Sequence, residues 1–197
     1  MAIVSDYYGT LQEAQDYFDN RLHEKAWSKA RPTDRPKALR AATIIIDTLA
    51  YKGVKAAVAN YMNSVPGRLW TDAAIRAADA SQPLKFPRGI APQGRGSFDA
   101  GVITNTTPPI PPDTEVPEAI RIACYEIAHS LLDGKDPERE LENLGISSHG
   151  FEGVRTAYDR SLIPVDHIVN GVPNALAWRL IQPFLRDDHA IRLSRVS

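Results

Sequence analysis

The stretch that decides the fold is residues 116–158, which read VPEAIRIACYEIAHSLLDGKDPERELENLGISSHGFEGVRTAY. Pro117 suits the first turn of a helix, and apolar side chains recur at helical spacing from there to Leu132. Gly134 follows, where such a helix commonly ends. The pattern predicts a long amphipathic helix. The stretch holds no nucleophile motif, metal-ligand cluster or phosphate-binding loop, which favours a protein that works by contact rather than by catalysis.

Two smaller elements complete this stretch. Asp136 and Pro137 begin a short acidic helix that ends at Gly145. Residues 151–158 alternate between apolar and polar side chains, which predicts a strand. This strand is one half of a hairpin if the chain turns at a nearby glycine, either Gly150 or Gly153.

Two helices in the N-terminal half carry cap signals. Thr10 and Glu13 have the spacing of a capping box, in which each side chain accepts a backbone N–H at the helix start. The apolar face of that helix is predicted to comprise Leu11, Ala14, Phe18 and Leu22. A shorter, alanine-rich helix is predicted over residues 71–80, with Thr71 as its cap.

Another helix is expected to start from a cap at Thr33 or Asp34, to reach about Ala50 and to be ended by Gly53. Its predicted apolar face comprises Ala38, Leu39, Ala42, Ile45, Ile46 and Leu49. Its predicted polar face, on the opposite side, comprises Lys37, Arg40, Thr43 and Asp47. A helix with such a division buries its apolar face against other elements.

The middle of the chain differs, since seven prolines and four glycines fall within the 30 residues 83–112. Proline removes backbone donors and glycine weakens regular structure, so neither a helix nor a central strand is expected there. Residues 83–115 are interpreted as an extended loop, which forms either an extended arm or a projecting hairpin. A last helix is expected to start at Pro173, with one apolar side made of Leu176, Leu180, Ile181 and Phe184.

Residues 186–197 lack a helical stripe and are interpreted as an extended C-terminal arm. The sequence therefore predicts a mainly α protein. It comprises one small helical-bundle domain over residues 1–185, with a short β element, a long Pro/Gly-rich loop and the C-terminal arm.

Composition limits the possible functions. The 197 residues include 23 Lys and Arg and 24 Asp and Glu, so bulk charge gives no reason to expect binding to nucleic acids or membranes. The single cysteine, Cys124, excludes an internal disulfide and fits a reducing compartment. No apolar run approaches the roughly 20 residues of a membrane span, and the start has no secretion signal. A soluble intracellular product is expected.

The long helix contains the residues that could carry chemistry. Glu126 and His129 have the spacing of half a di-iron site, but no second Glu-x-x-His occurs in the chain. Both are therefore expected at the polar edge of the helix, and neither a metal nor another cofactor is expected. Cys124 falls on the apolar face between Ile120 and Ile127, which predicts a core residue rather than a reactive thiol.

Residues 84–98 interleave basic and aromatic side chains and contain no acidic residue. The residues concerned are Lys85, Arg88 and Arg95, with Phe86 and Phe98. Such a composition can follow a nucleic-acid backbone. Solvated positions in a loop are the alternative interpretation.

Several segments in order carry a resemblance to a known family. They are Ala26-Trp27, Ala38–Asp47, Tyr51-Lys-Gly53, Gln82-Pro-Leu-Lys-Phe-Pro-Arg-Gly89, Val116–Ile120, Ala128–Gly134, Leu144–Ile146, Gly153–Tyr158 and the closing helix. This order resembles the head–tail connector, or adaptor, proteins of tailed bacteriophages, and it spans about residues 5–185. Related sequences are also described as DnaT-like single-stranded-DNA-binding proteins. The chain departs from the family pattern at residues 54–81, an insertion before Gln82.

The resemblance implies a non-enzymatic virion protein, made in the host cytoplasm, that forms a ring of commonly twelve subunits at the head–tail interface. Its partners would be the portal protein and tail or stopper (neck) proteins, and its bore would surround packaged double-stranded DNA. The C-terminal segment would reach the portal, which gives five candidate contacts: Phe184, Leu185, Ile191, Leu193 and Arg195. Copies of Lys85, Arg88 and Arg95 would line the DNA channel.

Two other classes of function stay open at this point. A single-stranded-DNA-binding module of replication would show salt-dependent affinity for oligonucleotides, although near-neutral charge and few aromatics equip the chain poorly for it. An enzyme with an unrecognised site would have to be built on Glu126 and His129.

Overall fold

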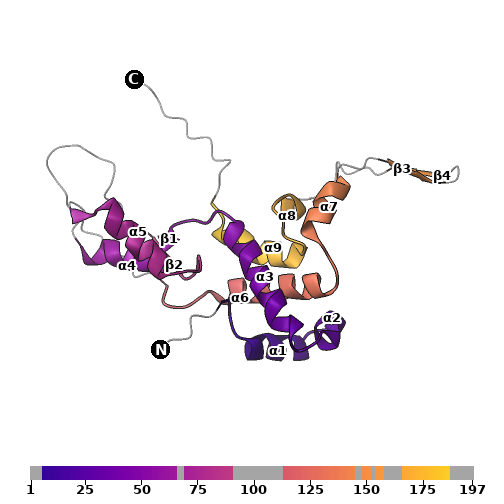
Figure 1. Ribbon diagram of the computed structural model, residues 1–197, viewed down its shortest axis with the longest axis horizontal. Helices are drawn as coiled ribbons and strands as arrows, with labels where there is room; N and C mark the ends of the chain where they lie inside the picture. Colours follow the sequence, from indigo (N-terminus) through magenta and orange to yellow (C-terminus); the bar gives the residue numbers. More distant parts are fainter. Residues whose placement is uncertain are drawn as a thin grey trace, which may run out of the picture. The chain divides into compact units, whose positions relative to one another are not determined.

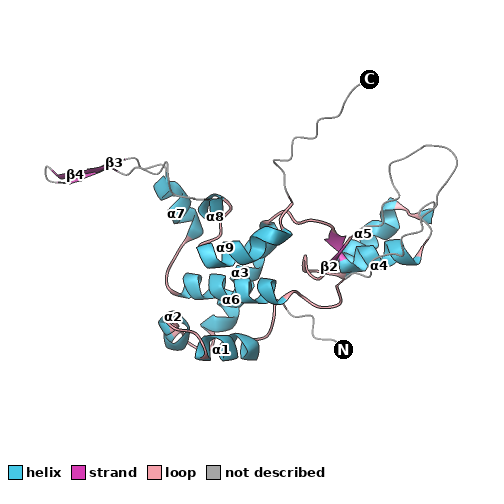
Figure 2. Ribbon diagram, turned by 180° about the vertical axis from the view of Figure 1, so that it is seen from behind, coloured by secondary structure: helices cyan, strands magenta, loops and turns pink. Residues whose placement is uncertain are grey.

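The chain divides into two compact units. Unit 1 combines Met1–Leu49 with Glu118–Pro183, and unit 2 combines Ala50–Pro117 with Phe184–Ser197. The computed structural model describes residues 6–65, 69–90, 113–144, 148–151, 154–157 and 166–186. Helices dominate both units (Figure 1, Figure 2), which confirms the mainly α class. The single domain expected over residues 1–185 stays a prediction.

The centre of unit 1 is helix α6, Glu118–Leu132, which packs against α3 and α9 (Figure 1). The described helices of this unit are α1 Leu11–Asp19, α2 Lys25–Lys29, α3 Asp34–Thr48, α6, α7 Pro137–Leu144, α8 Asp166–Val169 and α9 Ala175–Ile181. Strands β3, Ser148–Phe151, and β4, Val154–Ala157, form an antiparallel pair. The predicted long helix and the short acidic helix after it are therefore confirmed.

The core of unit 1 lies among α1, α2, α3, α6 and α9. Its largest fully buried apolar side chains include Trp27, Phe18, Leu39, Ile46, Ile120, Ile127 and Ile181. Burying one such side chain contributes about 1.5–3 kcal/mol relative to leaving it exposed. The Phe18 and Trp27 rings stack with their centroids 4.6 Å apart, which fixes α1 against α2. This apolar packing positions the polar cluster described below.

The capping box of α1 is confirmed. The Thr10 hydroxyl accepts the Glu13 N–H at 3.1 Å, and the Glu13 carboxylate accepts the Thr10 N–H at 2.8 Å. The other Glu13 carboxylate oxygen accepts from Arg121 at 2.6 Å, which ties the start of α1 to α6. Leu22 was wrongly predicted on the apolar face, since α1 ends at Asp19 and Leu22 is 83% exposed.

Helix α3 differs from the expectation at both ends. Thr33 has a helical backbone conformation and makes no side-chain cap hydrogen bond, while the Asp34 carboxylate pairs with Lys37 at 2.9 Å. The helix ends at Thr48, because the chain becomes extended at the buried Leu49, so Gly53 does not terminate it. The cap position at Thr33 is therefore confirmed without its hydrogen bond, whereas the prediction that Gly53 ends the helix was wrong.

Thr43 was also placed on the wrong face of α3. It is 3% exposed, and its hydroxyl accepts the Tyr8 N–H at 3.2 Å and lies 3.5 Å from Cys124 Sγ. A threonine can be buried when its hydroxyl has such partners. Cys124 itself is fully buried, as predicted.

The later elements of unit 1 follow the sequence with small shifts. Asp136 accepts the Glu138 N–H at 3.1 Å at the start of α7, as predicted. The last helix begins two residues after Pro173, since Asn174 is its N-cap. The hairpin is present, but the register pairs Phe151 with Val154, so Phe151 belongs to the first strand.

Unit 2 contains helices α4, Ala56–Ser64, and α5, Asp72–Ser81, which lie side by side (Figure 2). The predicted Thr71 cap of α5 is confirmed, since its hydroxyl accepts the Ala74 N–H at 3.2 Å. Strand β1, Val54–Lys55, pairs antiparallel with β2, Arg88–Gly89, and was not predicted. No helix in the described part of the chain is long and apolar enough to cross a membrane.

Gly53 has a structural role different from the one predicted. Its φ is +71°, and a Cβ at this position would lie 2.4 Å from the Gly89 carbonyl oxygen. A side chain here would therefore clash with backbone that cannot move independently of the β1–β2 pair. Gly53 permits the close approach of segments 51–55 and 88–89.

Candidate functional site

The residues that follow the last helix pair with the chain that enters unit 2. The Lys52 N–H donates to the Phe184 carbonyl at 2.9 Å, and the Arg186 N–H donates to the Ala50 carbonyl at 3.0 Å. These bonds flank an antiparallel bridge between Tyr51 and Leu185. We call residues 184–186 the arm root, because the predicted C-terminal arm begins there, at residue 186.

Gln82 begins the segment Gln82–Arg88 and organises it. Its side-chain amide donates to the carbonyls of Leu84 at 3.0 Å and Pro87 at 2.8 Å. Its amide oxygen accepts the Ala57 N–H at 3.0 Å in the first turn of α4. One glutamine therefore folds this segment onto itself and attaches it to a helix start, where N–H groups lack intrahelical partners.

Arg88 ends the same segment and binds three backbone carbonyls. Its Nε donates to Lys52 at 2.8 Å, its Nη2 to Gly53 at 2.7 Å and its Nη1 to Lys85 at 3.2 Å. Its guanidinium carbon also lies 5.6 Å from the centroid of the Tyr51 ring. A planar guanidinium suits such multiple bonding, whereas an ammonium group lacks its fixed geometry.

Aromatic packing joins the segment to the arm root. Phe86 is 2% exposed and Tyr51 is 6% exposed. Phe86 meets Tyr51 edge-on at 4.7 Å between ring centroids and meets Phe184 edge-on at 5.7 Å. Edge-to-face contacts of this kind add about 0.5–1.5 kcal/mol to burial alone. The arm root, residues 50–53 and residues 82–88 therefore form one local structure, which we call the arm-root clamp.

The structure brings together four of the eight residues proposed from the sequence, and all four lie in the arm-root clamp. Phe184 and Leu185 are half-buried there, as are Lys85 and Arg88. The Lys85 ammonium lies 5.9 Å from the centroid of the Tyr51 ring. The other four, Arg95, Ile191, Leu193 and Arg195, lie outside the described residues.

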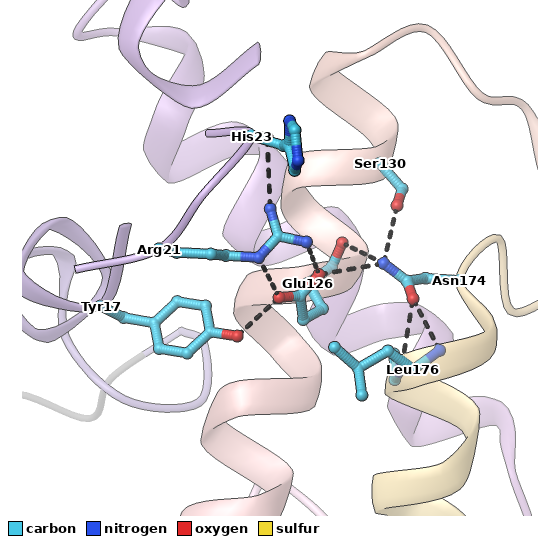
Figure 3. Close-up of polar contacts among 8 residues, drawn as sticks. Tyr17, Arg21, His23, Glu126, Ser130, Asn174 and Leu176 are labelled. Atoms are coloured by element: carbon cyan, nitrogen blue, oxygen red, sulfur yellow. Dashed lines mark hydrogen bonds and ion pairs between the residues drawn. The ribbon is translucent and has the colours of Figure 1, made fainter. Parts of the chain in front are cut away.

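A second polar cluster occupies the core of unit 1 (Figure 3), and its centre is the fully buried carboxylate of Glu126. Oε1 accepts from the Tyr17 hydroxyl at 2.6 Å and pairs with Arg21 Nε at 2.7 Å. Oε2 accepts from Arg21 Nη2 at 2.8 Å and from Asn174 Nδ2 at 3.1 Å. Glu126 was expected at the polar edge of its helix, and that prediction was wrong, since the side chain is fully buried. The partners that permit its burial come from distant segments of the chain.

Asn174 connects this cluster to the start of α9. Its side-chain oxygen accepts the N–H groups of Leu176 at 2.8 Å and Ala177 at 3.3 Å, which caps the helix. Its side-chain nitrogen faces the other way, toward Glu126, and also lies 3.1 Å from Ser130 Oγ (Figure 3). The cap and the buried carboxylate thus share one amide.

In this arrangement, the Arg21 guanidinium balances the charge of the Glu126 carboxylate, and hydrogen-bond donors fill its acceptor positions. Four donors occupy its two oxygens, so no acceptor position remains for a substrate or for a proton in transfer. Burial, together with the neighbouring carboxylate, raises the pKa of Tyr17 to about 12, so its hydroxyl stays a donor. The cluster is suited to holding α1, α6 and α9 together.

His129, the other residue of the predicted pair, faces an apolar neighbour. Its ring stacks on Phe18 with centroids 5.4 Å apart, and its Nε2 is buried with no hydrogen-bond partner within the described residues. Burial and the positive charge of Arg21 hold its pKa below the usual range. Within the described ranges, no group of His, Cys, Asp and Glu side chains is placed to hold a metal ion.

Cys124 is equally unsuited to covalent chemistry. Burial raises the pKa of its thiol to about 12, so the nucleophilic thiolate is scarce. Its sulfur lies 3.6 Å from the Leu39 carbonyl and packs between α3 and α6. The prediction of a buried core cysteine is confirmed.

Sequence reasoning missed several residues of both clusters. The partners of Glu126, which are Tyr17, Arg21 and Asn174, lie more than 40 positions away in the chain. Tyr51 of the clamp lacked a local signal beyond the motif Tyr51-Lys-Gly53. The one usable signal was Gln82–Arg88, whose unusual composition marks a specific backbone arrangement.

Comparisons of the chain with family models, with curated proteins and with solved structures found no match.

Proposed function

We propose that this chain is a structural virion protein, a head–tail adaptor that forms a ring beneath the portal and joins the DNA-filled head to the tail. The starting point is the order of segments that resembles the adaptor family, of which Gln82–Arg88 is the most distinctive. The portal protein and the tail or stopper proteins are its proposed partners. Packaged double-stranded DNA passes through the bore without sequence-specific contact.

The observation that carries the proposal is the pairing of the arm root with residues 50–52. A ring protein that reaches a partner through a terminal arm needs the arm to leave its body at a defined place. Two backbone hydrogen bonds and the Phe184–Phe86 contact provide such a place. In this proposal, the loop and the C-terminal arm that the sequence predicts are the parts that contact neighbouring proteins.

The chemistry of the described residues supports a non-catalytic role. Glu126 and His129 were the only candidate catalytic residues that the sequence indicated. The Glu126 carboxylate is fully committed to three side chains, and the His129 ring packs on Phe18. Buried ion pairs of this kind hold specific geometries together more often than they react.

Binding of single-stranded DNA is the weaker alternative. Base stacking needs exposed aromatic faces, and no aromatic side chain in the described residues is among the exposed large apolar ones. Tyr51 and Phe86, which lie beside Lys85 and Arg88, are buried. Salt-dependent binding of the free protein to oligonucleotides would favour this alternative.

A truncation tests the proposal. Removing residues 187–197 leaves both hydrogen bonds of the arm root in place, since Phe184 and Arg186 are retained. We expect the truncated protein to keep the helical content of the full chain and to lose binding to portal rings in co-sedimentation. Portal binding equal to that of the full chain would contradict the proposed role of the arm.

A further inference from the structure

We propose that the arm-root clamp is an intramolecular anchor for the C-terminal arm, in which Arg88 is a positioning residue rather than a DNA contact. The anchoring can be measured in the free protein, whereas its consequence for portal binding rests on the proposed function. The anchor consists of residues 50–53 and 82–88, and it holds residues 184–186.

The Arg88 guanidinium binds the protein's own backbone. Three hydrogen bonds of the guanidinium run to the carbonyls of Lys52, Gly53 and Lys85, so Arg88 fixes the course of the segment that pairs with the arm root. It donates from all three of its nitrogens to the protein's own backbone. A side chain committed in this way is a poor phosphate contact, because phosphate binding would require it to give up these bonds.

Lys52 links the Arg88 guanidinium to the arm root. Its carbonyl accepts from Arg88 Nε at 2.8 Å, while its N–H donates to the Phe184 carbonyl at 2.9 Å. The same peptide segment therefore receives Arg88 on one side and the arm root on the other. Loss of the Arg88 bonds is expected to loosen the Phe184 bond as well, since they share one short backbone segment.

The anchor also has an apolar side. Phe184 lies against Phe86, and the Arg88 guanidinium carbon lies 5.9 Å from the centroid of the Phe86 ring. Gln82 holds the Pro87 carbonyl at 2.8 Å, which keeps Phe86 in place from the other end of the segment. Phe184 thus has a partner within its own chain.

The experiment compares variants of the full-length protein by hydrogen exchange at two amides, those of Lys52 and Arg186, which donate the arm-root bonds. Arg88→Lys keeps the charge but loses the planar fork. We expect it to speed exchange at both amides by about tenfold or more, the factor that loss of a hydrogen bond to a charged group produces. Arg76→Ala, an exposed arginine on α5, should leave both rates unchanged.

Phe184→Ala is the second variant, because it removes the apolar contact without altering residues 82–88. It should speed exchange at the same two amides while those of α6 keep their wild-type rates, which shows that unit 1 stays folded. Wild-type exchange at Lys52 and Arg186 in both variants would overturn the anchor.

Portal co-sedimentation separates this inference from the proposed function. The anchor predicts that Arg88→Lys weakens portal binding although its charge is retained. An Arg88→Lys protein that binds portals like the wild type would overturn Arg88 as a positioning residue. If the wild-type protein leaves portals bare, the proposed function fails, while the exchange rates still decide whether the anchor exists.

Discussion

Phe184 meets Phe86 edge-on, with ring centroids 5.7 Å apart and ring planes at 88°. The two residues are almost 100 positions apart in the sequence, and their contact joins the arm root to the segment Gln82–Arg88 within unit 2. That segment has an unusual composition. The contact gives its composition a physical reason, since the phenylalanine, glutamine and arginine each hold the arm root or the backbone beneath it.

Removing the Phe86 ring should destabilise unit 2. Phe86 is 2% exposed and contacts two other rings, so Phe86→Ala is expected to lower the free energy of unfolding by about 3–5 kcal/mol. Ile90→Ala serves as the control, because Ile90 is 58% exposed and its loss should cost no more than about 0.5 kcal/mol. Unfolding in urea, monitored by hydrogen exchange, measures the free energy of unfolding of both variants. Similar losses for Phe86→Ala and Ile90→Ala would refute the packing described.

Arg21 should matter far more than an exposed arginine. Arg21→Ala leaves the Glu126 carboxylate buried without its cation, which is expected to cost about 3–5 kcal/mol. Arg40→Ala breaks an exposed pair with Asp6, whose side chains are 53% and 63% exposed, and should cost less than about 1 kcal/mol. Urea denaturation of the two variants gives the comparison, and equal losses would contradict the buried pair.

Asn174→Asp should reverse the usual preference at helix caps. Aspartate caps helices about as well as asparagine. Cap chemistry alone therefore predicts little change in stability when the N-cap of α9 is changed to aspartate. Here the new carboxylate would replace the donor that faces Glu126 Oε2 at 3.1 Å. We expect Asn174→Asp to be less stable than Asn174→Ala at neutral pH, because two carboxylates repel strongly in a buried site. The reverse order in thermal unfolding would contradict the shared amide.

The sequence predicted the elements whose signals are local. The Thr10–Glu13 capping box, the Thr71 cap, Gly134 after α6 and the Asp136 start of α7 all depend on residues within one turn of each other. Periodicity also found the buried face of α3, of which Leu39 and Ile46 are fully buried. Such features are fixed by short-range geometry, which a single sequence displays.

The sequence failed where distant segments decide the outcome. Thr43 and Glu126 are polar residues that become buried because Tyr8, Tyr17 and Asn174 bring hydrogen bonds to them. Helical periodicity assigns polar residues to the solvent side, and it contains no information on such partners. The β1–β2 pair was missed for the same reason, since two-residue strands have no periodic signal. The arm-root clamp combines three segments that are far apart in the chain, so no single stretch of the sequence predicts it.

Acid should destabilise unit 1 through His129. Burial and Arg21 lower the pKa of His129 in the folded protein, although Glu126 and Asp133 act in the opposite direction. The unfolded chain, with a pKa near the usual value of about 6.5, therefore takes up the proton first as the pH falls. The contribution of neutral His129 to the free energy of unfolding is therefore fully present above the unfolded-state pKa. It is lost as the pH falls through the lower folded-state pKa.

Comparison with a non-titrating variant isolates this effect. His129→Gln should lose less stability than the wild type between about pH 7 and about pH 5, because the other acidic groups titrate in both proteins. The free energy of unfolding in urea, measured at each pH, gives the two slopes. Identical slopes would show that His129 does not carry the acid sensitivity.

Electron microscopy of negatively stained portal rings mixed with the full-length protein tests the central claim most directly. The head–tail adaptor predicts an added collar of density at the narrow end of the portal, and averaged end views of that collar give the number of subunits. Bare portals at a saturating concentration of the protein would contradict the adaptor function.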